Sequence, residues 1–139
     1  MKKKAFVWII AAVLILVALT TIFLHRASED PILAKRIEEQ AQDGVTKISL
    51  NTLTDFDWDQ AMIYGPYTSK EMIEDTLDIK FKGSTHGIEL REDLFLLVFA
   101  NGKYAVKTVE LSRRSFDYSE NDHLLTPAYD HLKINHYAP

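Results

Sequence analysis

The chain has 139 residues, no cysteine, and 16 Lys and Arg against 20 Asp and Glu, which gives a formal net charge of −4. This length accommodates one domain, and the absence of cysteine excludes disulfides, zinc–thiolate sites, cysteine nucleophiles and a cysteine-linked lipid anchor. All acidic residues follow Arg26, so residues 28–139 carry a net charge of −8, from 12 basic and 20 acidic side chains. We predict no nucleic-acid partner, because such binding requires clustered Lys and Arg, and cationic partners remain open.

Residues 5–24 form an apolar segment in which 18 of 20 side chains are apolar. A helix of this length spans about 30 Å, the thickness of the hydrocarbon core of a bilayer. The alternative is a cleaved signal peptide, whose apolar run is usually about 7–15 residues long and ends in a small-x-small site. The exit near Ala27 offers no clear site of that kind. We therefore predict a retained signal anchor over residues 1–27, with the lipid bilayer as the partner of residues 5–24.

The charges on the two sides of this segment predict its orientation. Lys2, Lys3, Lys4 and the α-amino group outweigh Arg26 on the far side. Cytoplasmic flanks carry the excess of Lys and Arg, so the N-terminus is expected in the cytoplasm. The chain would then be a single-pass protein of the cell membrane, and residues 28–139 would form one extracytoplasmic domain.

The first element of that domain is a helix that begins at Asp30-Pro31 and stops before Gly44. Asp can cap the free N–H groups, Pro fits the first helical turn, and Gly suits the left-handed residue after a helix. The helix is either a juxtamembrane stalk or the first packed helix, and an apolar stripe favours packing: Ile32, Leu33, Ile37 and Ala41.

Residues 45–53 alternate weakly between apolar and polar and predict a strand. Phe56 and Trp58 alternate with acidic residues, which indicates the start of another strand with both rings buried. The apolar run 61–64 follows and is closed by the turn dipeptide Gly65-Pro66.

Thr68 and Glu71 match the S/T-x-x-E capping box, with Thr68 as the cap and Glu71 reaching back to it. The helix that follows is expected to end by Asp78 and to bury three side chains: Met72, Ile73 and Leu77.

Residues 93–100 and 103–111 flank Asn101-Gly102, the strongest short signal for a hairpin. A type I′ turn at this dipeptide requires positive φ at both positions. The first strand is almost entirely apolar, which predicts a central strand covered on both faces. The second strand alternates, so one of its faces should be in contact with water.

Residues 83–87 and 119–130 predict loops, and residues 131–137 predict a last strand with Leu132 and Ile134 facing inward. The whole pattern predicts the α+β class. A transmembrane helix is followed by a small domain of about two helices packed on a mostly antiparallel sheet of about five strands.

The segment Asp55–Asp59 places three carboxylates at alternate positions, which would project from one face of a strand. An EF-hand is excluded, because Gln60 replaces the turn glycine and Pro66 replaces the final glutamate. Three interpretations remain: a solvated strand face, which is favoured, an acidic patch for a partner, and a cation site. Because Tyr and Trp are common at contact surfaces, we predict one partner surface from five residues: Asp55, Asp57, Asp59, Tyr64 and Tyr67.

The sequence predicts no catalytic residue, cofactor or metal, and hence no enzyme. The five histidines, at positions 25, 86, 123, 131 and 136, lack the spacing of a zinc site. Ser115 and Ser119 lack a nucleophile motif, and no acid–base partner is evident for the scattered carboxylates Glu89, Glu92 and Asp93.

Two stretches resemble a group of small, uncharacterised proteins of Gram-positive bacteria: FDWD at residues 56–59 and IYGPYTSKE at residues 63–71. The apolar strand, the Asn101-Gly102-Lys103 turn and the second strand are similar to the same group, so the resemblance covers roughly residues 45–137. It implies a signal anchor or lipoprotein leader and an extracytoplasmic domain, and no known activity. The layout of an anchor plus an acidic α+β domain is also similar to that of immunity proteins against secreted toxins.

These observations predict a non-catalytic, membrane-anchored module that binds an unknown protein, an immunity target or an envelope component. The alternatives are a small envelope hydrolase or cation-dependent enzyme, and a structural accessory subunit of a membrane complex.

Overall fold

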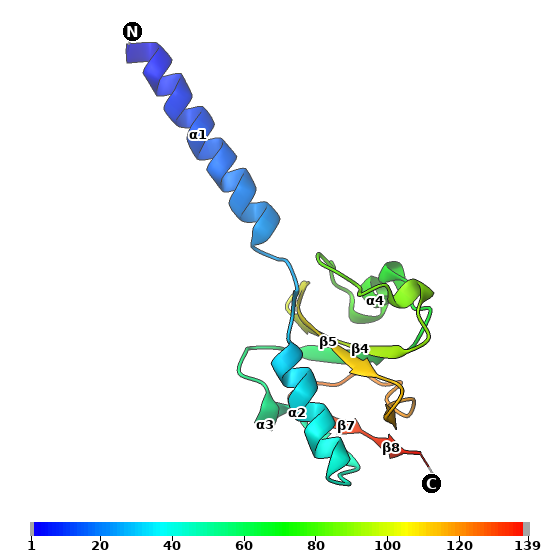
Figure 1. The fold of residues 1–139 in the computed structure, drawn as a ribbon. Helices are drawn as coiled ribbons and strands as arrows, with labels where there is room; N and C mark the ends of the chain where they lie inside the picture. The colour runs from blue at the N-terminus through cyan, green and yellow to red at the C-terminus, as the bar shows by residue number, and fades with distance from the viewer. Residues whose placement is uncertain (1, 138–139) are drawn as a thin grey trace.

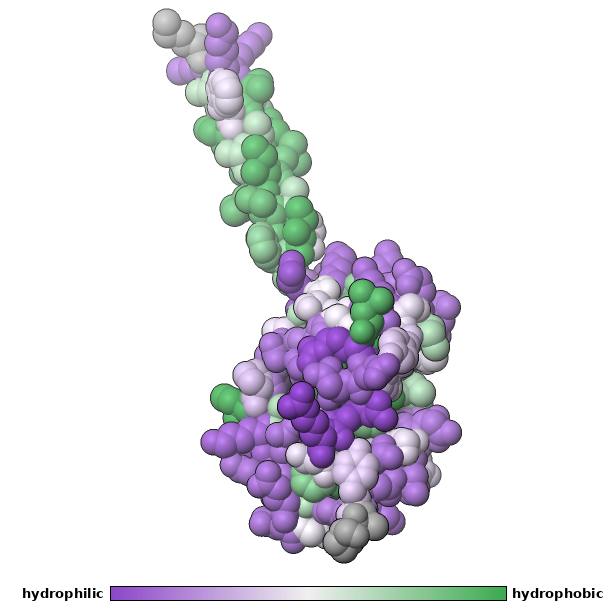
Figure 2. Space-filling view, turned by 45° about the vertical axis from the view of Figure 1, so that its right-hand side comes forward, coloured by the Kyte–Doolittle hydropathy of each residue, from purple (hydrophilic) through white to green (hydrophobic). Residues whose placement is uncertain are grey.

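The computed structural model describes residues 2–137, which form an isolated helix and a folded domain (Figure 1). Helix α1 (Lys2–Phe23) has no buried residue, so it is not the core helix of the domain. It is long and apolar enough to cross a membrane. Figure 2 shows α1 as a hydrophobic rod next to a mainly hydrophilic domain surface.

The domain is built on a four-stranded sheet in the order β1-β5-β4-β3. Strand β1 (Ser28–Glu29) is parallel to β5 (Tyr104–Ser112), and β4 (Leu94–Asn101) pairs antiparallel with both β5 and β3 (Gln60–Tyr64). Strand β4 is buried at every position except Asn101, which confirms the prediction of a central strand covered on both faces. The α+β class with a mostly antiparallel sheet is also confirmed.

Each face of this sheet has its own core, because alternate side chains of β4 point to opposite sides. On one face, Phe95, Leu97 and Phe99 pack under helix α2 (Pro31–Gln42). On the other, Leu96 and Val98 pack against helix α4 (Lys70–Leu77) and the short 3-10 helix η1 (Ile88–Leu90).

Two small sheets complete the α2 side: β2 (Lys47–Ser49) pairs with β7 (His131–Lys133), and β6 (Phe116–Asp117) pairs with β8 (Asn135–His136). Residues 45–53 are therefore not one strand, since β2 leads directly into helix α3 (Leu50–Leu53). The predicted strand 131–137 is likewise split, because Ile134 separates two pairings. The inward positions of Leu132 and Ile134 are confirmed, with exposures of 0% and 2%.

Helix α2 is packed and begins as its sequence indicates. Asp30 accepts a hydrogen bond from the Leu33 amide at 3.0 Å, Pro31 occupies the first turn, and Gly44 has a φ of +87°. Leu33, Ile37 and Ala41 are buried in the core, which confirms the packed interpretation. Ile32, however, is 64% exposed and does not belong to the buried stripe.

Helix α4 ends at Leu77, in agreement with the prediction that it ends by Asp78, but its predicted cap and one predicted buried position were wrong. Ser69 is the cap and accepts from the Met72 amide at 3.2 Å, whereas the Thr68 hydroxyl donates back to the Gly65 carbonyl at 2.6 Å. The turn at Gly65 turns the Thr68 hydroxyl away from the helix, so the capping box does not form. Met72 is 53% exposed because it lies on the outer face.

The β4–β5 hairpin is confirmed, but its turn lies one residue later than predicted. Asn101 pairs with Tyr104, so Gly102 and Lys103 are the loop residues. Gly102 has a φ of +64°, whereas Asn101 does not have a positive φ. Positive φ at the first loop position alone is the pattern of a type II′ turn, not type I′. The pairing also has a register shift between Phe99 and Ala100.

A short segment with contacts to the domain connects α1 to the sheet. The Leu24 amide still donates to the Thr20 carbonyl, and the Ala27 amide already donates to the Lys82 carbonyl at 2.7 Å. Between them, the His25 ring stacks on Tyr104 with centroids 3.9 Å apart. We call residues 24–29 and their contacts the anchor junction.

Candidate functional site

The segment Asp55–Asp59 is irregular, and β3 begins only after it, so the predicted strand start was wrong. The prediction that the aromatic side chains of this segment point inward and its carboxylates point outward was correct. Trp58 is 7% exposed and Phe56 packs half-buried against the core. Both rings meet Phe99 edge-on, with centroids 5.2 and 5.1 Å away.

The three carboxylates of this segment, Asp55, Asp57 and Asp59, are exposed. They do not form a group of ligand atoms close enough to share a cation, among the residues that the structure describes. Asp59 has a structural contact instead, since its Oδ2 accepts from the Gly102 amide at 3.0 Å in the hairpin turn. The cation interpretation of this segment gains no support from the geometry, and the acidic patch remains a prediction.

Tyr64 is only 6% exposed, so its assignment to an exposed partner surface was wrong. Its hydroxyl lies 2.5 Å from the Thr76 hydroxyl, and burial raises the pKa of Tyr64 to about 12. Tyr67 is 58% exposed and its hydroxyl contacts Glu92. Strand β3 lies between Asp59 and Tyr67, and a strand rises about 3.3 Å per residue. Tyr64 is therefore not part of an exposed surface, and a partner surface formed by the other four residues remains a prediction.

A different set of charged side chains gathers in an open cavity of about 460 Å³ beside β1 and β5. Its lining comes from β1, α2, the start of β4 and the end of β5. The charged members are Glu29, Lys35, Glu38, Arg91, Asp93, Glu110 and Arg114.

His86 connects this cavity to the core. Its side chain is 11% exposed; one ring nitrogen, Nδ1, lies 3.4 Å from Glu110 Oε2. The other, Nε2, lies 3.0 Å from the hydroxyl of Thr108, which is itself buried. His86 has a φ of +57°, an uncommon backbone conformation for a residue with a side chain. The ring is therefore held between a buried hydroxyl and a carboxylate at the cavity.

Arg91 holds the outer edge of this group. Its guanidinium donates two hydrogen bonds of 2.8 Å to Asp93 and one of 3.2 Å to the His86 carbonyl. It also lies 3.3 Å from Glu110 Oε1. The hydrogen bonds from Arg91 lower the pKa of Asp93 below its usual value. Arg91 thus orients Glu110 through one oxygen and leaves the other oxygen facing His86.

Thr108, His86 and Glu110 stand in the order hydroxyl, imidazole, carboxylate, which is the order of a hydrolase triad. The order alone does not produce catalysis, because the nucleophile must reach a substrate. Thr108 is 1% exposed, beneath the loop that carries His86. The His86–Thr108 hydrogen bond and the contact of His86 with Glu110 therefore hold these side chains together, and they do not expose a nucleophile.

Glu29, His86 and Glu110 each offer a ligand atom, and these atoms lie within 4.8 Å of one another. Glu29 is exposed, whereas His86 and Glu110 are partly buried. Two carboxylates and one imidazole form a donor set that divalent metals accept.

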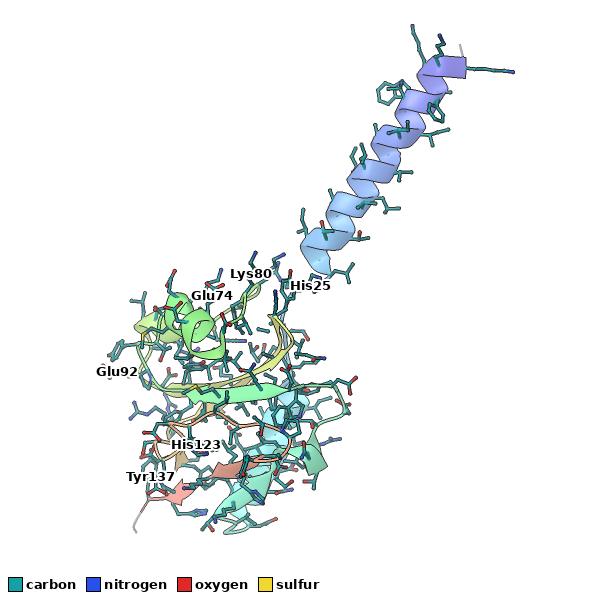
Figure 3. All side chains as sticks on the ribbon, turned by 180° about the vertical axis from the view of Figure 1, so that it is seen from behind. His25, Glu74, Lys80, Glu92, His123 and Tyr137 are labelled. Carbon is teal, nitrogen blue, oxygen red and sulfur yellow. The ribbon has the colours of Figure 1, made fainter. Side chains whose placement is uncertain are left out.

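A second cavity, of about 300 Å³, lies beside the loop before β7. Its lining includes Tyr129 and Leu124, which are 76% and 44% exposed. We call the lining of this cavity the Tyr129 surface. It consists of Lys47, His123, Leu124, Tyr129, His131 and Lys133. In Figure 3, His123 lies in the half of the domain away from α1, whereas His25 and Lys80 lie beside the end of α1.

Comparisons with protein-family models, with curated proteins and with solved structures each gave no match to this chain.

The sequence interpretation missed both cavities for the same reason. The members of each come from segments far apart in the chain, and only the pairing of β1 with β5 and of β2 with β7 brings them together. One signal was available: Glu110 lies at an outward position of an alternating strand, where a paired charge is expected.

Proposed function

We propose that this chain is a membrane-anchored, non-catalytic module that binds a protein, an envelope component or a secreted toxin. In this proposal α1 crosses the membrane, the N-terminus is cytoplasmic and the domain lies outside. The apolar helix and the lysines at its start support this topology.

The Tyr129 surface is the observation that carries the proposal. Exposed Tyr side chains contribute strongly to protein contacts, and Tyr129 lines this cavity together with two lysines and two histidines in an otherwise acidic domain. A partner with an acidic, partly apolar surface would complement it. Its place away from α1 leaves it accessible when α1 is in a bilayer.

The burial of Thr108 supports binding over hydrolysis, because the hydroxyl in the row of Thr108, His86 and Glu110 is not accessible to a substrate. The acidic segment Asp55–Asp59 remains a second contact surface, one that would prefer a cationic partner.

A photo-crosslinking residue placed at position 129 of the full chain, in native membranes, tests the proposal. We expect one stoichiometric adduct that is lost when His131 and Lys133 are both replaced by Ser. The matched control carries the crosslinker at position 90, where Leu90 is 88% exposed. An adduct from position 57 alone would transfer the contact to the acidic segment, and no adduct from any of the three positions would reject a protein-binding module.

The cation-dependent enzyme remains the second candidate, because Glu29, His86 and Glu110 converge beside an open cavity. It requires turnover of an ester, amide or phosphoester substrate that depends on added metal and is lost in His86→Asn.

A further inference from the structure

We infer that Glu29, His86 and Glu110 form a binding site for one divalent transition metal ion, with zinc as the best-matched probe. This site is separate from the Tyr129 surface, so it does not depend on the proposed protein partner.

The ligand atoms converge from three different segments. Glu29 comes from β1, His86 from the loop before η1, and Glu110 from β5. Their mutual distances of 4.8 Å or less need only a small closure, because ligands about 2.0–2.2 Å from a zinc ion lie about 3.3–3.6 Å apart. Glu29 is exposed and can supply that movement.

The surroundings of the ligands resemble those of built metal sites. A metal-bound histidine usually has its second nitrogen fixed by a hydrogen bond, and here Nε2 of His86 meets the buried Thr108 hydroxyl at 3.0 Å. A ligating carboxylate is usually oriented by a further contact, and Arg91 provides it at Glu110 Oε1, 3.3 Å away. Nδ1 of His86 and Oε2 of Glu110 then face each other at 3.4 Å.

The donor set restricts the metal. An imidazole nitrogen disfavours calcium and magnesium, which prefer oxygen ligands. The absence of cysteine and the two carboxylates disfavour ions that select soft sulfur ligands. A borderline ion such as zinc fits nitrogen and oxygen together, and the open cavity leaves room for water at the remaining positions.

Metal bound here would connect the anchor junction to the domain. Glu29 lies immediately after the segment that leaves α1, and His86 and Glu110 belong to the sheet and its covering loop. The ion would therefore cross-link β1 to β5 through side chains, next to the two residue pairs that already join them, Ser28–Lys107 and Glu29–Thr108.

Calorimetric titration of the full chain with zinc, in detergent and without a histidine tag, tests the inference. We expect one saturable site per chain, a rise in melting temperature with zinc, and little response to calcium. His86→Asn should weaken binding on the order of tenfold or more, because a ligand is removed. Asn tolerates the left-handed backbone of His86, so the variant should keep its fold.

Two matched controls separate this site from general zinc binding by surface residues. Glu38→Gln changes a carboxylate in the same cavity, outside the ligand group, and His131→Asn changes an exposed histidine. Both should bind zinc as the parent does, whereas Glu110→Gln should weaken binding as His86→Asn does. The inference is overturned if the parent shows no saturable site, or if His86→Asn and Glu110→Gln bind zinc like the controls.

Discussion

Gly83 lies where the segment leaving α1 passes over the domain, and the approach is too close for a side chain. Its φ is +136°, and a Cβ atom built there would lie 2.8 Å from the Ala27 carbonyl oxygen. The backbone of Ala27 is held in place by its hydrogen bond to Lys82, so it cannot easily give way.

Gly83→Ala should therefore destabilise the full chain by about 1–3 kcal/mol, the usual range for a strained backbone combined with a clash. Gly44→Ala is the control, because Gly44 also has a positive φ but has nothing within 4 Å. Thermal unfolding should show a larger loss for Gly83→Ala than for Gly44→Ala. Equal losses would mean that the contact with Ala27 does not contribute.

Asp130 holds the loop before β7 onto β2 and α3. Its side chain is 9% exposed and accepts from the Ser49 hydroxyl at 2.5 Å and the Asn51 amide at 2.9 Å. Burial raises the pKa of Asp130, but these hydrogen bonds outweigh it and the pKa lies below its usual value of 3.8.

Asp130→Asn should lower the free energy of unfolding at pH 7 by about 1.5–3 kcal/mol, because a charged hydrogen-bond acceptor is lost. The pKa of Asp130 is lowered by folding, so its stabilisation is complete above roughly pH 4 and is lost as the pH falls through the folded pKa. Denaturant unfolding from pH 7 to pH 2 should show parent and variant converging in acid. A difference that stays constant over this range would contradict the assignment.

Trp58 and Asp57 are neighbours with opposite environments. Trp58→Ala should lower the free energy of unfolding by about 3–5 kcal/mol, the usual loss for a large buried aromatic side chain. Asp57→Asn should change it little, because an exposed carboxylate contributes little to stability. Chemical denaturation of the two variants distinguishes them. A stable Trp58→Ala together with an unfolded Asp57→Asn would reverse the assignment of inside and outside in this segment.

At the scale of the elements, the sequence correctly predicted the helices and strands that are determined by residues close together in the chain. Asp30-Pro31 and Gly44 bound α2, and the apolar run of β4 together with Gly102 defined the hairpin. The failures occurred where a partner distant in the chain decides the backbone. Residues 50–53 become helical where the Leu50 amide meets the Asp130 carbonyl, and Asp55–Asp59 bends so that two rings reach Phe99.

The sequence predicted the candidate sites less well than it predicted the fold. His86 looked like an isolated loop histidine because Thr108 and Glu110 are far from it in sequence. The aromatic cluster near Tyr64 misled the interpretation, because the same residue types form both cores and contact surfaces.

The hairpin offers a direct test at this scale. Gly102→Val should destabilise the chain by about 1–2 kcal/mol, because a β-branched residue resists the φ of +64° found there. Lys103→Val is the matched control, since Lys103 is the other loop residue and has no positive φ. Melting temperatures should fall further for Gly102→Val. No difference between the two would mean that the turn is assigned to the wrong residues.

For the whole molecule, the proposed topology has a direct measurement. A reporter that works only outside the cytoplasm should be active when it is fused after Pro139. The mature chain should also keep its N-terminal residues. Replacing Lys2, Lys3 and Lys4 with Ser should reduce this activity, because the excess of basic residues before α1 is then lost. A mature protein that begins near Ser28 would show that the apolar segment is cleaved.

The anchor junction has a consequence for the kind of partner that can be captured. Only His25 and Arg26 separate the last helical hydrogen bond of α1 from the first hydrogen bond to the domain, and His25 is already stacked on Tyr104. Two residues extend at most about 7 Å, so the domain stays close to the end of α1 and its range of positions relative to the helix is restricted. If α1 crosses a bilayer as proposed, the Tyr129 surface would lie in the half of the domain away from the lipid (Figure 3). Under the proposed function, that position would favour a soluble partner, or one that extends far from the membrane, over a partner that is buried in the same membrane.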